Sequence, residues 1–330
     1  MASNHPNTDQ NKTTRSLINP KKFKIFIFQP EESFFTSSFE ERLKILESRV
    51  LLAKKKMQED VLEEKDVDKI EKNKEVKMGW FQNKKNKLGK WLSREEQSKP
   101  VSPSERQPAP PSAIFVAPEY LFKDFSELCY QRYYTQQQKN EFKNKLKELS
   151  LNTDMLIVPG TMCWRKKAKA DQSTYYRNTA YFFYHGEVQK YKKKNPHTHY
   201  DFDYVDEGFL GYMDLRRNYF KTGQDAPVKD FLGIKIGSEI CFDSVQGELF
   251  HFIKENKVIL DMQLILADGA KGATPVEQEG VLFIKVEKNK EETQIGILKI
   301  DSLDNEKIEL NPALSSDFLD GDDLTCFKFK

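Results

Sequence analysis

The stretch GSEICFDS, residues 237–244, places Cys241 shortly after an apolar segment, residues 231–236. The apolar segment predicts a buried β-strand, and the small residues Gly237 and Ser238 predict a tight turn before the cysteine. A thiol at the end of such a strand lies at the carboxyl edge of a sheet, where α/β enzymes place reactive groups. A buried core cysteine is the alternative, because free cysteine also packs as a small hydrophobe.

Two other ionisable residues follow predicted strands in the same way. Glu119 comes after a short apolar segment, in the motif APEYLF. Lys193 lies in the motif YKKKNP, which follows the apolar segment 179–184 and a His-Gly turn. The alternatives are a surface carboxylate and a solvated lysine run, in which Lys192 or Lys194 takes the inward position if the register differs. A carboxylate, a cation and a thiol in this order form a candidate catalytic set.

These motifs resemble the three signatures of the nitrilase superfamily, the carbon–nitrogen hydrolases of amides and nitriles. The family's Pro-Glu, Tyr-x-Lys and Gly-x-x-x-Cys-x-Asp signatures match Glu119, Lys193 and Cys241. The resemblance extends from Phe23 to about Gly272. It implies an α-β-β-α sandwich, in which two sheets pack face to face between helical layers. It also implies a homodimer that pairs through the helices flanking the nucleophile.

The resemblance further implies a reaction. Cys241 would lose its proton to Glu119, attack the carbonyl carbon of an amide and form a thioester that water hydrolyses. Lys193 and the backbone N–H of Phe242 would stabilise the oxyanion. The expected substrate is a small-molecule amide rather than a nitrile, because Cys241-Phe242-Asp243 resembles the amidase and carbamoylase branches. The family's chemistry uses no metal and no cofactor.

A second glutamate lies near the substrate in many family members, between the lysine and the cysteine. Glu207 is the first candidate, because it is the only glutamate between Lys193 and Glu239. Asp206 and Asp214 are rivals, and an acidic surface loop is the alternative. The sequence therefore leaves the identity of this carboxylate open.

Two further residues are expected to support the site, and a third matches a family position in the helix that follows it. Glu239 precedes Cys241 by two positions, so strand alternation puts both side chains on one face and favours a contact between Glu239 and Lys193. Trp164 is expected to contact the substrate. Glu248 matches the family's glutamate at the start of the helix after the nucleophile.

Predicted strands alternate with predicted helices along most of the chain, which indicates an α/β fold. The helices are recognised by apolar side chains at helical spacing, and the strands by short apolar segments. We expect strands at 24–28, 114–116, 155–159 and 264–267, and helices at about 38–62, 139–149 and 248–255.

A single domain is expected over residues 21–330, after a disordered N-terminus at 1–20. An insertion at about 63–112 interrupts this domain after the first helix. Within it, residues 72–94 hold eight Lys or Arg against one Glu, together with two tryptophans and a phenylalanine, and a Pro-rich linker follows at 100–111. Such a segment is typical of an arm that binds an anionic membrane surface or a protein partner, and a mobile loop is the alternative.

The C-terminal part, about residues 273–330, departs from the family pattern. Residues 280–286 and 293–300 predict a β-hairpin with a polar turn. Residues 301–330 are acidic, and we expect a loop there. This departure concerns one wall of the pocket rather than the three candidate catalytic residues.

The composition is that of a soluble globular protein, with 38% hydrophobic residues, 32% charged residues and a net charge of +2. That balance predicts no specific nucleic-acid partner. No apolar run approaches the ~18 residues of a membrane span, and the polar start lacks a signal peptide, so we expect a cytoplasmic protein. Four scattered cysteines without a CxxC pair favour a reducing compartment. His197 and His199 lack a third ligand motif and predict no metal site.

A cysteine-dependent amide hydrolase is the function that these residues predict. The alternative is an interaction module: a nitrilase fold that keeps the site residues, has weak or no catalysis and acts through its insertion. The two hypotheses differ in the reactivity of Cys241, which should exceed that of the other cysteines only in the enzyme.

Overall fold

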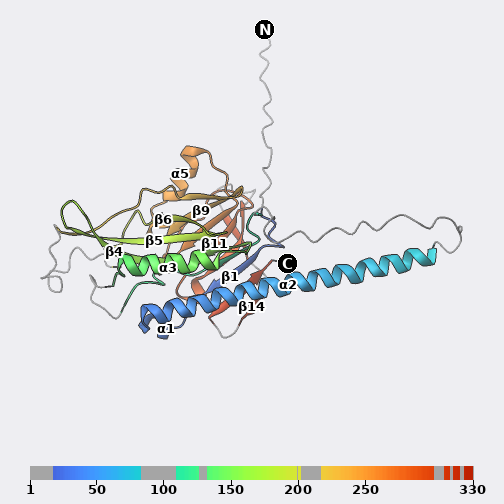
Figure 1. Ribbon diagram of the computed structural model, residues 1–330. Coiled ribbons are helices and arrows are strands. Elements are labelled where there is room, and N and C mark those ends of the chain that lie inside the picture. The colour runs from blue at the N-terminus through green and yellow to red at the C-terminus, as the bar shows by residue number, and fades with distance from the viewer. Residues whose placement is uncertain are drawn as a thin grey trace, which may run out of the picture.

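Two β-sheets pack against each other through their apolar faces, and helices lie outside them (Figure 1). The computed structural model describes residues 18–82, 109–125, 132–198, 200–201, 217–300, 308–312, 315–319 and 323–329 of the 330-residue chain.

The first sheet, sheet A, holds nine strands of the described chain. Seven lie in the order β14-β15-β1-β2-β3-β5-β4, and β6 and β7 also pair with β5. β1, β2 and β3 run parallel, so their carboxyl ends share one edge of the sheet. The strands are β1 Lys24–Phe28, β2 Ala113–Val116, β3 Met155–Val158, β4 Thr161–Lys167, β5 Thr174–Tyr184, β6 Glu187–Lys192, β7 Asn218–Phe220, β14 Ser315–Phe318 and β15 Leu324–Lys328.

The second sheet, sheet B, holds six strands of the described chain in the order β13-β12-β11-β10-β9-β8. β9, β10 and β11 run parallel, so the residue after β9 lies at the edge where all three strands end. The strands are β8 Val228–Phe231, β9 Ile234–Ile240, β10 Met262–Leu266, β11 Leu282–Val286, β12 Gln294–Ile300 and β13 Ile308–Pro312, with a short 3-10 helix at Lys290–Glu292.

Helices cover the outer face of each sheet. α2 and α3 pack on sheet A, and α5 packs on sheet B, which gives the four-layer α-β-β-α sandwich that the sequence predicts (Figure 1). α3 begins where Thr135 and Gln138 cap its first turn reciprocally. The helices are α1 Glu32–Thr36, α2 Phe39–Gln82, α3 Gln136–Leu149, α4 Phe242–Val245 and α5 Glu248–Asn256.

The strand that leads to Cys241, β9, begins at Ile234, later than the apolar segment 231–236 suggests. That segment contains the turn of a hairpin between β8 and β9, at Leu232 and Gly233. Both turn residues have positive φ, 54° and 96°, as two-residue hairpin turns require. The prediction of one continuous strand over 231–236 was therefore wrong, because an apolar leucine occupies the turn.

Gly237 and Ser238 lie inside β9 rather than in a turn, so their predicted role was also wrong. A Cβ atom at Gly237 would lie 2.6 Å from a methyl carbon of Leu249 and 2.8 Å from one of Leu260. Glycine at this position therefore allows α5 to pack closely on the strand that carries the cysteine.

α2 continues to Gln82, well past the predicted end near residue 62, and extends beyond the sandwich in Figure 1. Its side chains are described only as far as Asp60. That aspartate forms ion pairs with Lys24 of β1 and Lys328 of β15 at 2.9 and 3.2 Å. Residues 83–108, which include most of the predicted basic arm and the Pro-rich linker, lie outside the described residues.

The described residues of the C-terminal part lie mostly in β-strands. The hairpin predicted at 280–300 is confirmed by the antiparallel pair β11 and β12. The loop predicted for 301–330 was wrong, because β13 extends sheet B while β15 pairs antiparallel with β1 in sheet A. The end of the chain thus ties the two sheets together.

At the other end, residues 1–17 lie outside the described residues, and Ile18 is buried in the core between the sheets. Of the helices that the described ranges contain, none combines the length and the apolar character needed to cross a membrane.

Candidate active site

Cys241 lies in a strained turn between β9 and α4. Its φ and ψ are 45° and −102°, a conformation that costs about 1–3 kcal/mol for a residue other than glycine. Its backbone N–H donates to the Leu266 carbonyl of β10 at 2.8 Å, and its carbonyl accepts from the Ser244 N–H at 3.0 Å. These bonds hold the thiol at the carboxyl edge of sheet B, where it is half-buried.

Glu119 and Lys193 meet beside this turn, as the sequence predicts. Glu119 follows β2 and Lys193 follows β6, and the Lys193 Nζ lies 2.8 Å from the Glu119 Oε1. Both side chains are fully buried. The Asn178 side-chain amide, from the middle of β5, donates to the same carboxylate oxygen at 2.8 Å. The second oxygen, Oε2, is buried without a hydrogen-bond partner, which leaves one face of the carboxylate available.

The register assigned to Lys193 is supported by its neighbours. Lys192 pairs with Asp225 at 3.0 Å, and Lys194 pairs with Glu248 at 3.0 Å, and both lysines are partly exposed. Lys193 alone of the three is directed into the interior. Alternation along the chain after β6 explains why one lysine turns inward and its two neighbours outward.

Asp201 completes the polar cluster, and the sequence reasoning missed it. Its Oδ2 lies 2.6 Å from the Lys193 Nζ, and its Oδ1 accepts from the Asn178 amide at 3.1 Å. The His197 N–H donates to Oδ2 at 2.8 Å, and the Tyr133 hydroxyl donates to the Asp201 carbonyl. Within the described ranges Asp201 therefore takes the place expected of a second carboxylate.

The other candidates for the second carboxylate, Glu207, Asp206 and Asp214, lie outside the described residues. A signal for Asp201 was present in the sequence, since it is the first acidic residue after Lys193. The family pattern favours a glutamate, so Asp201 was not among the predicted candidates.

Burial sets the ionisation of the cluster. The pKa of Glu119 is raised above its usual value by burial, although Lys193 opposes the shift. Burial lowers the pKa of Lys193, but the charges of Asp201 and Glu119 outweigh it and raise that pKa, so Lys193 stays protonated. Burial also acts on Asp201, yet Lys193 holds its pKa below the usual range. The cluster therefore contains one fixed cation, one fixed anion and one carboxylate poised to accept a proton.

The thiol of Cys241 is protonated at rest. Burial raises its pKa first, and the nearby Glu119 carboxylate raises it further, while Lys193 lowers it. The lowering of the thiol pKa by Lys193 is smaller than either of the two opposing effects. A thiol of this kind needs a base during attack. Glu119 is the candidate for that base, because the Cys241 thiol interacts with its carboxylate.

Asp243 links the lysine segment to the nucleophile turn. It is buried and accepts hydrogen bonds from the Tyr191 hydroxyl at 3.0 Å, from the Lys194 N–H at 3.1 Å and from the Asn195 N–H at 2.7 Å. The motifs Tyr-x-Lys-x-Asn and Cys-x-Asp are therefore two halves of one contact, with Lys193 held between its anchors. Burial raises the pKa of Asp243 to about 6.

Replacing Asp243 with alanine should displace Lys193 and destabilise the fold. The change leaves buried donors without an acceptor, at a cost of about 2–3 kcal/mol in unfolding free energy. Iodoacetamide labelling of Cys241 should change with it. Glu248→Gln is the matched control, because Glu248 contacts the same segment at the surface. Equal denaturant midpoints for the two variants would show that Asp243 does not have this role.

Glu239 has a different role from the one expected. Its Oε1 accepts from the Leu249 N–H at 2.9 Å, and its Oε2 accepts from the Gln263 amide at 3.3 Å. Glu239 therefore provides a hydrogen-bond acceptor for a free backbone N–H group in the first turn of α5. It makes no contact with Lys193. Burial raises its pKa to about 7.

Phe242 and Trp164 lie in different surroundings. The Phe242 N–H, which follows Cys241, has no hydrogen-bond acceptor among the described residues and is free to donate to an oxyanion. Trp164 is buried in the core beneath α3, where its Nε1 donates to Thr179 at 3.0 Å and Lys139 lies over its ring. That position does not support the expected contact between Trp164 and substrate.

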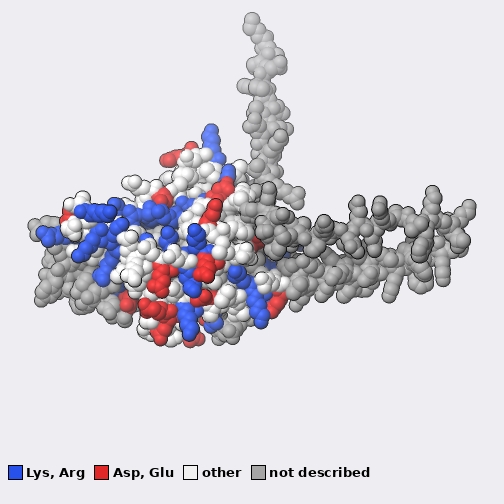
Figure 2. All heavy atoms as spheres, viewed as in Figure 1, with Lys and Arg blue, Asp and Glu red and all other residues white. Residues whose placement is uncertain are grey.

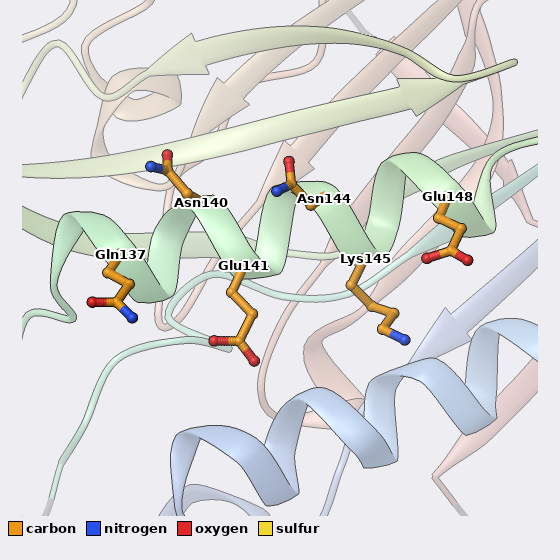
Figure 3. Close-up of a pocket in the computed structure, with 6 residues that line it drawn as sticks. All are labelled: Gln137, Asn140, Glu141, Asn144, Lys145 and Glu148. Atoms are coloured by element: carbon orange, nitrogen blue, oxygen red, sulfur yellow. The ribbon is translucent and has the colours of Figure 1, made fainter.

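A shallow hollow on the surface lies away from this cluster. It is formed by α3 alone, and its side chains do not converge: Glu141, Lys145 and Glu148 point toward α2, whereas Asn140 and Asn144 point the other way (Figure 3). We therefore place the candidate active site at the buried cluster beside Cys241.

Comparison with known proteins identifies the fold. No protein-family model and no curated protein matches the chain. Among solved structures, a cysteine-to-serine mutant of the Nesterenkonia AN1 amidase from the nitrilase superfamily is 11% identical, with a TM-score of 0.50 over 94% of this chain and 93% of that one. Glutamine-dependent NAD+ synthetase from Acinetobacter baumannii is 13% identical, with a TM-score of 0.47 over 92% of this chain.

The chain spans only 45% of the length of that synthetase, but nearly the whole length of the amidase. The molecule therefore has the fold of the nitrilase superfamily. This confirms the fold expected from the three signatures.

Proposed function

We propose that the chain is a cysteine-dependent hydrolase of a carbon–nitrogen bond other than a peptide bond, and that its substrate is a small amide. The observation that carries the proposal is the meeting of Glu119 and Lys193 beside the strained turn of Cys241. A base and a fixed cation that follow strands of sheet A, beside a thiol that follows a strand of sheet B, are the groups that acyl transfer requires.

The positions of these groups support the following reaction. The free Oε2 of Glu119 takes the thiol proton while the Cys241 sulfur bonds to the carbonyl carbon. The negative charge on the carbonyl oxygen is stabilised by the Lys193 ammonium and the Phe242 N–H. Glu119 then gives its proton to the departing nitrogen, and the C–N bond breaks to leave a thioester. Water, deprotonated by Glu119, attacks the thioester, and the released thiolate recovers the proton.

A panel of small primary amides with ammonia detection tests the proposal. Wild type should release ammonia from at least one amide, and Glu119→Gln should release none from the same compound, because glutamine accepts no proton at neutral pH. The matched control is Glu248→Gln, the same change at a residue outside the cluster. Ammonia release by Glu119→Gln at the wild-type rate would refute the mechanism.

The alternative function, an interaction module, is favoured by the projection of α2 beyond the sandwich (Figure 1). We propose that residues 72–94 serve location or partner choice rather than chemistry. Their cations and aromatic residues suit the surface of an anionic membrane.

Replacing residues 63–108 with a short Gly/Ser linker should keep the site intact, because Asp60, the last residue of α2 whose side chain is described, is already anchored to β1 and β15. Labelling of Cys241 should proceed at the wild-type rate, and binding to phosphatidylserine vesicles should be lost. Slower labelling would indicate that this segment shapes the substrate pocket.

A further inference from the structure

Six cationic side chains gather on the outer face of sheet A beside α3. Figure 2 shows Lys and Arg side chains concentrated at the end of the molecule where β4 and β5 lie. We call the group the basic face, and it consists of Lys139 and Lys143 of α3, Lys166 of β4, Arg177 of β5, Lys190 of β6 and Lys221 after β7.

Strand register places these residues on one face. Arg177 is opposite Trp164, which lies beneath α3, and Lys190 is opposite Tyr181. Since side chains alternate along a strand, Lys166 shares the face of Trp164. The Lys139 ammonium lies 4.8 Å from the Trp164 ring, and this contact joins α3 to the same surface.

The basic face lacks the carboxylates that accompany neighbouring cations. Lys145 and Lys192, close to it in sequence, each pair with an acid, but no member of the basic face has an acidic partner within 4.0 Å in the described ranges. The Nη1 of Arg177 is enclosed without a hydrogen-bond acceptor. Burial, together with the charges of Lys143, Lys166 and Lys190, lowers the pKa of Lys139 to about 8. The cations repel one another, and a bound polyanion would relieve that repulsion.

Two tyrosine rings lie among the cations. The Tyr175 ring is 5.1 Å from the Lys221 ammonium, 5.5 Å from the Arg177 guanidinium and 6.3 Å from the Tyr219 ring. Both tyrosines are partly exposed. Aromatic rings beside cations form a platform on which nucleobases stack while phosphates contact the lysines.

A membrane is less well matched to this face. Membrane surfaces are held by apolar side chains that enter the acyl boundary as well as by cations. The exposed large apolar residues of the described chain are Leu51, Leu151, Tyr200, Leu232, Val245 and Ile259. None of them belongs to β4, β5, β6 or β7.

We propose that the basic face binds single-stranded nucleic acid without base specificity, with phosphates on its lysines and a base against Tyr175. This goes beyond the proposed hydrolase function and does not depend on it. The sequence predicts no specific nucleic-acid partner, and the binding proposed for the basic face has no base specificity.

Fluorescence anisotropy with a labelled oligouridylate of about 20 nucleotides tests the proposal on the full-length chain. The double variant Lys166→Glu/Lys190→Glu should bind at least about tenfold more weakly, and affinity should fall steeply between about 50 and 200 mM salt, as phosphate contacts require. Tyr175→Ala should weaken the single strand more than a duplex of equal length. The matched control is Lys235→Glu/Lys299→Glu, which reverses two exposed lysines on sheet B.

Iodoacetamide labelling of Cys241 reports whether each variant is folded. Equal binding by the two double variants would overturn the proposal. A second result would also overturn it: binding to phosphatidylserine vesicles that depends on Lys166 and Lys190, with no binding to RNA. That result would assign the basic face to a membrane. Equal loss on single strand and duplex in Tyr175→Ala would remove the stacking role and with it the preference for single strands.

Discussion

Replacing Cys241 with alanine is expected to abolish hydrolysis of every amide that the wild type accepts. Removing a covalent nucleophile lowers kcat by at least about 10⁴-fold in comparable enzymes, because the partners that remain have no group to activate. The fold should be unaffected, since the thiol is half-buried and its hydrogen bond to the Asp268 carbonyl is a long one, 3.9 Å. Steady-state ammonia release and a thermal melt measure the two effects.

Cys241→Ser should be nearly as inactive, because a serine hydroxyl is far less acidic than a thiol and Glu119 is a weak base for it. Cys326→Ala is the control for loss of a thiol elsewhere, since Cys326 is buried in β15 and away from the cluster. Turnover by Cys241→Ala above a trace would exclude the proposed nucleophile.

Lys193→Met should give the second large loss, about 10²- to 10³-fold in kcat/KM, the effect of removing one oxyanion donor. It should also change the pH profile. Glu119 acts as a base only when ionised, so kcat/KM falls as the pH drops through its raised pKa. Lys193 lowers that pKa, and its removal should move the acidic limb to higher pH. Lys192→Met, at the surface, should leave both quantities unchanged.

Asp201→Asn should shift the pH profile in the direction opposite to Lys193→Met. The charge of Asp201 raises the pKa of Glu119, so its removal should move the acidic limb to lower pH. Opposite shifts in two variants of the same cluster are not expected from general loss of structure. Shifts in the same direction would show that Glu119 is not the base, and an effect of Lys192→Met equal to that of Lys193→Met would show that the register is wrong.

The sequence predicted the candidate site residues that come directly after a strand in the chain. Glu119 and Cys241 each come just after a buried strand, so short motifs were enough to identify them. The two strands belong to different sheets, and the packing of sheet A on sheet B brings the two residues together. To identify Lys193, one of three consecutive lysines had to be chosen as the inward one. Tyr191 and Asn195 on either side of it fix that choice, because both donate to Asp243.

Other features depend on contacts that no local pattern reveals. Asp201 is held by His197 and Tyr133, and the latter lies far away in the sequence. The segment 301–330 was predicted to be a loop because the strand that β15 pairs with, β1, lies near the other end of the chain. Gly237 was predicted to be a turn residue, but a glycine is required there because α5 packs closely against the strand.

Capture of the acyl group by hydroxylamine is the measurement that tests the central claim most directly. A thioester on Cys241 partitions between water and hydroxylamine, so wild type supplied with an accepted amide should form the acyl hydroxamate as ammonia is released. Acid-quenched enzyme should carry the acyl mass on the peptide that contains Cys241. Cys241→Ala should form neither product. Hydroxamate formation by Cys241→Ala, or ammonia release by wild type with no acyl group on Cys241 and no hydroxamate, would contradict the account.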